Sequence, residues 1–173
     1  MVFEACVEAG PDRCGLHEAS AAQVKARFDA LFAKLKRRPI AVSTNSTRAT
    51  ALDYGVVDYA LVKWLVLVFL YSPYATTPGV AGLAGLLFNW LREAEEGDAA
   101  AIWAVMSALQ GISQCECPRG APPTSEFQDA FHAISCGDGD RVEDTVEELE
   151  AHQARIMEDS FFGDLWTFRA VCV

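Results

Sequence analysis

Apolar residues recur at helical spacing through most of the chain, and this pattern predicts a series of amphipathic helices. The clearest case covers residues 19–37, where the apolar side chains fall on one face and Pro39 follows the last turn. Its face consists of Val24, Phe28, Leu31, Phe32 and Leu35. Two strongly apolar helices, over residues 54–71 and 80–95, are expected to form a helical hairpin, and a further helix covers residues 98–109.

Non-helical segments separate these helices. Residues 1–16 are expected to form a loop, and residues 40–42 a short extended piece. Polar or proline-rich loops are expected over residues 43–48, 72–79 and 110–124, because proline and glycine interrupt regular structure.

The pattern changes at residues 131–136, a short apolar run that ends in glycine and aspartate at residues 137–140. We interpret this run as a buried strand, which needs neighbouring strands to satisfy its backbone groups. The chain offers few such neighbours. An acidic helix with one apolar face should follow, and a last helix should run from Asp164 to Cys172. The apolar face consists of Val142, Val146, Leu149, Gln153, Ile156 and Met157.

Composition excludes several classes of protein. With 51% hydrophobic and 22% charged residues, the chain is expected to be globular. A formal charge of −10 argues against binding to nucleic acid, and the one basic run, residues 34–38, closes a predicted helix. The most apolar segment, residues 56–71, is interrupted by charges at Asp58 and Lys63 and is shorter than the roughly 20 residues of a membrane span. No membrane span is therefore expected, and the N-terminal residues lack the pattern of a signal peptide.

The cysteines indicate an oxidising compartment. The chain has six, an even number, and Cys6 and Cys14 flank a turn-rich segment that suits a small disulfide loop. An acceptor sequence for N-glycosylation begins at Asn45 in a predicted loop. Both features predict a secreted or extracellular protein.

No catalytic or metal site emerges from the residues. The Gly-x-Ser-x-Gly elbow of α/β-hydrolases is absent, and His17, His132 and His152 fit no arrangement with serine and acid. One group of residues could offer three thiolates and an imidazole to zinc, but its spacing is unusual for a zinc site. The group is Cys115, Cys117, His132 and Cys136. Residues 138–140 begin like a calcium loop, yet Glu143 stands where that loop requires glycine, so neither a metal nor another cofactor is expected.

The apolar hairpin has two interpretations. Its side chains form an ordinary core, or its two helices cover a hydrophobic substrate cleft as a lid. In the second case the cleft is lined by Tyr71, Tyr74, Phe88 and Trp90.

The order of features resembles the cap region of the tripeptidyl-aminopeptidase-like α/β-hydrolases, which are secreted serine peptidases and esterases of fungi and actinobacteria. The matching features are Phe3, Cys6, Gly10, Cys14, Leu16, the helix ending at Pro39, Tyr71, Pro73, residues 83–98, Ala133, Ile134, Cys136, Asp138, Phe162, Gly163 and Cys172.

This resemblance implies a mainly α fold, a cap-like bundle of about five to seven helices with at most one or two short strands. Residues 1–128 would form the helical cap-like region, and residues 129–173 a strand and helices that return into a hydrolase core. The resemblance also implies disulfides between Cys6 and Cys14 and between Cys136 and Cys172. It assigns no role to Cys115 and Cys117.

The implied function is the cap and substrate-pocket part of a serine hydrolase for a small peptide or ester. The family's catalytic residues lie outside such a cap, so the chain is not expected to perform acyl transfer alone. Its expected partners are the remaining catalytic part of the hydrolase or, through the apolar helices, further copies of itself. The alternative is a secreted helical binding or interaction protein that uses the apolar hairpin.

Overall fold

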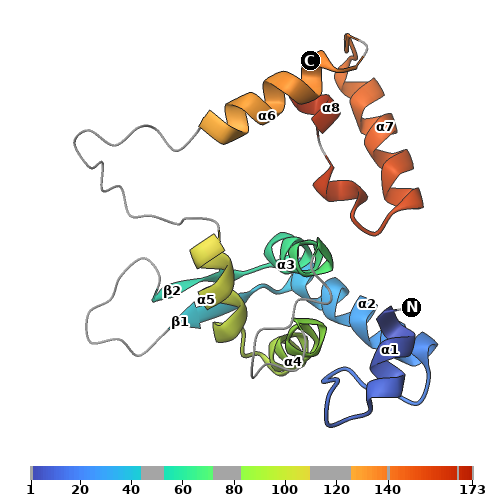
Figure 1. The fold of residues 1–173 in the computed structure, drawn as a ribbon, viewed down its shortest axis with the longest axis vertical. Coiled ribbons are helices and arrows are strands. Elements are labelled where there is room, and N and C mark those ends of the chain that lie inside the picture. The colour runs from blue at the N-terminus through green and yellow to red at the C-terminus, as the bar shows by residue number, and fades with distance from the viewer. Residues whose placement is uncertain are drawn as a thin grey trace. The chain divides into compact units, whose positions relative to one another are not determined.

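The computed structural model of the chain describes residues 2–43, 53–71, 83–109, 126–139, 141–166 and 168–172. Within these residues it contains eight α-helices and one two-stranded sheet, which confirms the mainly α class (Figure 1). The chain divides into two compact units, residues 1–114 and residues 115–173, each of which is described by itself. No described helix is both long enough and apolar enough to cross a membrane.

The N-terminal unit is built around helix α2 (Ala21–Arg37), as its sequence pattern predicts. Ser20 caps the helix, because its hydroxyl accepts a hydrogen bond from the Gln23 amide at 3.3 Å. All five side chains of the predicted apolar face are buried. The periodicity of this segment therefore determined both the helix and the face that enters the core.

Three further helices pack around α2. Helix α3 (Tyr59–Tyr71) contacts α2, helix α4 (Leu83–Glu96) contacts both α2 and α3, and helix α5 (Ala100–Leu109) contacts α3 (Figure 1). The core that they enclose includes Leu16, Leu31, Leu35, Leu65, Leu91, Ile102 and Met106, each of which is almost completely buried. The helices expected over residues 80–95 and 98–109 are thus present from Leu83 and from Ala100.

Two short antiparallel strands complete this core. Strand β1 (Ile40–Ser43) pairs with strand β2 (Tyr54–Val57), with Ile40 opposite Val57, and α5 packs against both strands. The extended piece at residues 40–42 is confirmed. The prediction that a helix begins at Tyr54 was wrong, because residues 54–57 pair with β1 and the helix begins only at Tyr59.

Helix α1 (Val2–Ala9) corrects the prediction that residues 1–16 form a loop. It packs against α2 and ends at Gly10, whose φ of 79° suits glycine best. Residues 10–17 then turn back, and the Cys6–Cys14 disulfide ties the turn to the helix. The short helix was missed because its eight residues are fewer than the stretch over which a helical period can be recognised.

The described residues of the C-terminal unit form three helices and a short 3₁₀ turn. They are α6 (Glu126–Gly137), α7 (Val146–Asp159), η1 (Gly163–Leu165) and α8 (Phe168–Val171). The last helix predicted from Asp164 to Cys172 is therefore broken into the 3₁₀ turn and α8. The acidic helix is confirmed in α7, with a start at Val146.

Helix α6 overturns the strand predicted over residues 131–136. A lone strand would leave its backbone donors and acceptors without partners, whereas a helix satisfies them within itself. The strands β1 and β2 belong to the other unit and pair only with each other among the described residues. The apolar run at residues 131–136 therefore becomes helical, and its Phe131 and Ile134 side chains are exposed.

Candidate functional site

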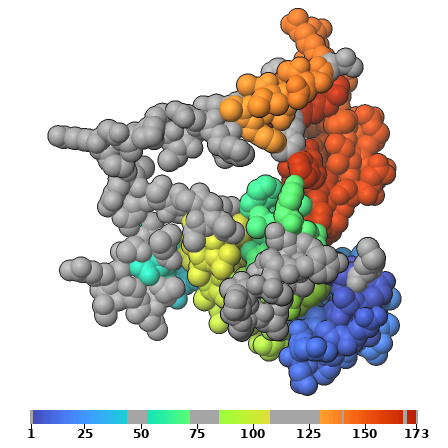
Figure 2. All heavy atoms as spheres, in the orientation of Figure 1, coloured from blue at the N-terminus to red at the C-terminus, as the bar shows by residue number. Residues whose placement is uncertain are grey.

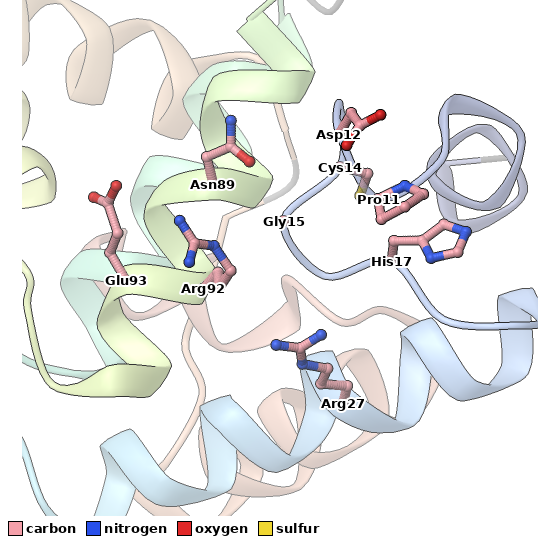
Figure 3. A pocket seen from close by; sticks show the side chains of 9 residues that line it. All are labelled: Pro11, Asp12, Cys14, Gly15, His17, Arg27, Asn89, Arg92 and Glu93. Carbon is pink, nitrogen blue, oxygen red and sulfur yellow. The ribbon is translucent and has the colours of Figure 1, made fainter.

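A polar cleft lies where the disulfide loop of the N-terminal unit meets helices α2 and α4 (Figure 3). Its volume is about 530 Å³. It is lined by Pro11, Asp12, Cys14, Gly15, His17, Arg27, Asn89, Arg92 and Glu93. The loop provides the first five of these residues, α2 provides Arg27, and α4 provides the last three.

The loop reaches α4 because Gly15 has no side chain. A Cβ atom at this position would lie 2.6 Å from the carbonyl oxygen of Phe88 and 2.9 Å from the Cα of Asn89. Cys14, whose disulfide fixes the loop, is buried. The close approach of two backbones, held by a covalent bond, therefore shapes one wall of the cleft.

Arg27 joins α2 to α4 beneath the cleft. Its guanidinium donates to both carboxylate oxygens of Glu95, with Nη2 2.6 Å from Oε2, and Nη1 lies 3.3 Å from Glu18 Oε1. The hydrogen bonds that Arg27 donates to Glu95, together with the charges of both carboxylates, raise the pKa of Arg27 above its ordinary value. Lys34 adds a second link by donating to the Glu95 carbonyl oxygen at 2.6 Å.

Other polar groups of the cleft retain hydrogen-bonding capacity. Figure 3 shows the guanidinium groups of Arg27 and Arg92 rising from their helices, with Asp12 and His17 on the loop. Arg92 pairs with Glu96 through one nitrogen at 3.2 Å and is partly exposed. The described residues that line the cleft include no serine, and Cys14 is oxidised, so they offer donors and acceptors for a polar ligand but no hydroxyl or thiol nucleophile.

A smaller cleft, of about 320 Å³, lies within the C-terminal unit between α7 and α8. It is lined by Asp144, Glu148, Ala151, His152, Arg155 and Arg169. Arg169 donates to both carboxylate oxygens of Asp144, with Nη2 2.9 Å from Oδ1, and this hydrogen bonding lowers the pKa of Asp144. His152 thus lies beside an acid that is committed to arginine, and no serine lines the cleft.

None of the three described substrate-pocket candidates, Tyr71, Phe88 and Trp90, lines either cleft. Phe88 is only 4% exposed and belongs to the core, and Trp90 packs edge-on against Phe69 with ring centroids 5.6 Å apart. Tyr71, at the end of α3, is 72% exposed. Tyr74 lies outside the described residues, so a pocket formed by all four residues stays a prediction.

Both disulfides implied by the resemblance are present. Cys6 is bonded to Cys14 and Cys136 to Cys172, with Cα atoms 5.4 Å and 5.2 Å apart. Asn45, Cys115 and Cys117 lie outside the described residues. Among the residues that the structure does describe, no group of three or more His, Cys, Asp or Glu side chains is placed to hold a metal ion.

The residues of the polar cleft were missed in the sequence as a group. Arg27 falls on the polar side of a predicted helix, and Asn89 and Arg92 interrupt an apolar one, so each has an ordinary explanation there. The signal that points to the cleft is the pair Cys14–Gly15, a fixed cysteine next to a residue that permits close backbone approach.

The residues that the structure describes form a mainly helical protein with two disulfides. Comparisons with models of known families, with curated proteins and with solved structures find no match.

Proposed function

We propose that the chain is the cap and adjoining segment of a secreted serine α/β-hydrolase of the tripeptidyl-aminopeptidase-like type. In this role it shapes the pocket for a small peptide or ester and leaves the acyl-transfer chemistry to another part of the enzyme. The proposal rests on the order of residues that resembles this family and on the two disulfides that match the implied pairs.

One observation carries the proposal furthest. The C-terminal unit is held by the Cys136–Cys172 disulfide and by the Asp144–Arg169 ion pair, yet Gly163 is its only buried residue among those described. The described residues of this unit therefore form no hydrophobic core of their own. Its exposed apolar side chains are therefore suited to pack against a larger core, such as that of a hydrolase.

The gene tests the proposal directly. Its reading frame should encode a Gly-x-Ser-x-Gly elbow upstream of this segment, and an acid and a histidine downstream of it. Sequencing the full transcript checks this expectation. A transcript without an upstream elbow would refute the cap assignment.

An activity measurement gives a second test. The purified chain should not hydrolyse p-nitrophenyl esters, whereas the chain produced together with the flanking segments should do so and should react with a fluorophosphonate probe. Turnover by the isolated chain that a serine-directed inhibitor abolishes would contradict the proposal, because it would demonstrate a nucleophile within these residues.

A stand-alone binding protein is the second candidate. It is favoured by the exposure of Trp64, Leu70 and Tyr71 on α3, one helix of the apolar hairpin. A transcript that ends near this segment, with no hydrolase elements, would favour this candidate over the first.

A further inference from the structure

The C-terminal unit leaves much of its apolar surface in contact with solvent. Ile134 on α6 and Val146 at the start of α7 are 60% and 67% exposed. Other large apolar side chains of the same unit are also exposed: Phe131, Met157, Phe161, Trp166 and Val171. In Figure 2, α6 and α7 are the orange and red-orange helices.

Four of the apolar residues of α7 lie on one side of the helix, which we call the α7 apolar face. They are Val146, Leu149, Ile156 and Met157. They are spaced three, seven and one residues apart, and at about 100° per residue this spacing places them within an arc of about 100° around the helix. The turn at Gly163 covers part of this face beside Ile156, and the two ends, at Val146 and Met157, stay exposed.

The same unit carries nearly all the net charge of the protein. Residues 115–173 contain thirteen acidic and four basic residues, a formal charge of −9. Residues 1–114 contain eleven acidic and ten basic residues, a formal charge of −1. Two of the four basic side chains, Arg141 and Arg169, are paired with the acids Glu143 and Asp144.

The net charge of the C-terminal unit determines which kind of partner can bind the α7 apolar face. A second copy of the chain would bring another unit of −9 against the first, and like charges at close range disfavour that contact. The same repulsion excludes anionic lipid surfaces and nucleic acid. A different protein with an apolar surface bordered by lysine and arginine complements both properties.

We propose that the C-terminal unit docks, through the α7 apolar face, onto a basic amphipathic surface of another protein. The apolar side chains supply the area that leaves water on docking, and the glutamates bordering them, such as Glu147 and Glu150, pair with the basic rim. The inference goes beyond the proposed function, since it holds whether or not that protein is the catalytic part of a hydrolase.

Defined peptides test the chemistry on the full chain. The probe is a 14-residue amphipathic helix of leucine and lysine, and its controls are the same peptide with glutamate in place of lysine and a peptide of lysine alone. Isothermal titration calorimetry should detect binding of the leucine–lysine peptide only. The affinity should fall about tenfold or more between low salt and 0.5 M salt, because the charge contribution is screened.

Matched variants locate the surface. Val146 and Val2 are both the first residue of a helix and both exposed, and aspartate suits that position. At 0.5 M salt, which screens the added charge, Val146→Asp should weaken peptide binding about tenfold, equal to about 1.4 kcal/mol, whereas Val2→Asp should leave it unchanged. At low salt, Glu150→Lys should weaken binding and Glu8→Lys, on α1, should not. Circular dichroism verifies that each variant keeps its helix content.

Three results would overturn the inference. Equal binding of the leucine–glutamate peptide would show that charge does not select the partner. Equal effects of Val146→Asp and Val2→Asp would place the contact elsewhere. Dimerisation in analytical ultracentrifugation that Val146→Asp abolishes would make a second copy the occupant. Each result leaves the transcript test of the hydrolase proposal unaffected.

Discussion

Gly15 lies at the contact between the disulfide loop and helix α4, where the structure has no space for a side chain. Two of the atoms that a Cβ would meet, the carbonyl oxygen of Phe88 and the Cα of Asn89, belong to the backbone and cannot turn aside as the Asn89 side chain could. The fit of the loop on α4, and with it the wall of the polar cleft, depends on this one residue.

Gly15→Ala should therefore destabilise the N-terminal unit by about 1–3 kcal/mol, the usual cost of overpacking. Urea unfolding followed by tryptophan fluorescence measures the change. Gly10→Asn is the matched control in the same loop, because no atom lies within 4 Å of a Cβ there and asparagine tolerates the positive φ. An unchanged midpoint for Gly15→Ala would show that the loop is not held against α4.

Asp144 provides a prediction about pH. The hydrogen bond from Arg169 lowers the pKa of Asp144 below its ordinary value, so the folded chain keeps this carboxylate ionised to lower pH than the unfolded chain does. The pair therefore stabilises the C-terminal unit at neutral pH, and its contribution is lost as the pH falls through the lowered pKa. In an NMR titration, the Asp144 midpoint should rise in Arg169→Gln; equal midpoints in both proteins would contradict the pairing.

At the scale of elements, helix α7 of the C-terminal unit has a well-formed N-terminal cap. Thr145 and Glu148 form a reciprocal capping box: the Glu148 amide donates to the threonine hydroxyl at 3.3 Å, and the Thr145 amide donates to Glu148 Oε2 at 2.8 Å. Because the helix buries none of its residues, local interactions such as this cap account for much of its stability.

Thr145→Ala should cost about 1 kcal/mol of local helix stability, which corresponds to about fivefold faster amide exchange in the first turns of α7. Hydrogen exchange measured by NMR detects this change. Thr145→Ser keeps the hydroxyl and should exchange at the original rate. Similar acceleration in both variants would mean that the hydroxyl does not cap the helix.

The elements also show how far the sequence could predict the fold. Helix α2 was predictable because a single helix face enters the core and a serine and a proline mark its ends. Residues 54–57 and 131–136 were misassigned because short apolar runs suit a strand or a helix equally well. The first is a strand because β1 lies beside it, and the second is a helix because no described strand is available to pair with it.

The whole molecule consists of two units that differ in how they are stabilised. Residues 1–114 enclose a core of large apolar side chains from several helices and both strands. Residues 115–173 depend, among the described residues, on a disulfide, an ion pair and helix capping, with little burial. Burial provides most of the cooperative stability of a domain, so the units should differ in protection from exchange.

Hydrogen exchange of the intact chain checks this difference. Amides of α2, α3 and α5 should exchange only through global unfolding of their unit, whereas those of α6 and α7 should exchange through local opening, faster by about two orders of magnitude or more. Reduction of both disulfides should accelerate exchange in α6 and α8 further, since Cys136–Cys172 joins them. Equal protection of the two units would show that the C-terminal unit has a core.

The candidate clefts depend on the tertiary fold, because their residues come from separate parts of the sequence. Arg27 and Glu95 are far apart in the chain and meet only because α2 packs against α4. No local pattern encodes that meeting, which explains why the cleft was not predicted while the capping residues were.

The sequence by itself determined the helices whose apolar residues recur with the helical period, the ends marked by capping residues and proline, and the acidic character of the C-terminal unit. These features depend on residues within a few positions of one another, where spacing alone fixes the outcome. Only the tertiary structure decided that residues 54–57 pair as a strand, that residues 131–136 are helical, and that Arg27 reaches Glu95. Each of these outcomes depends on which segment lies nearby in the folded chain, and the spacing of residues along the sequence does not specify that.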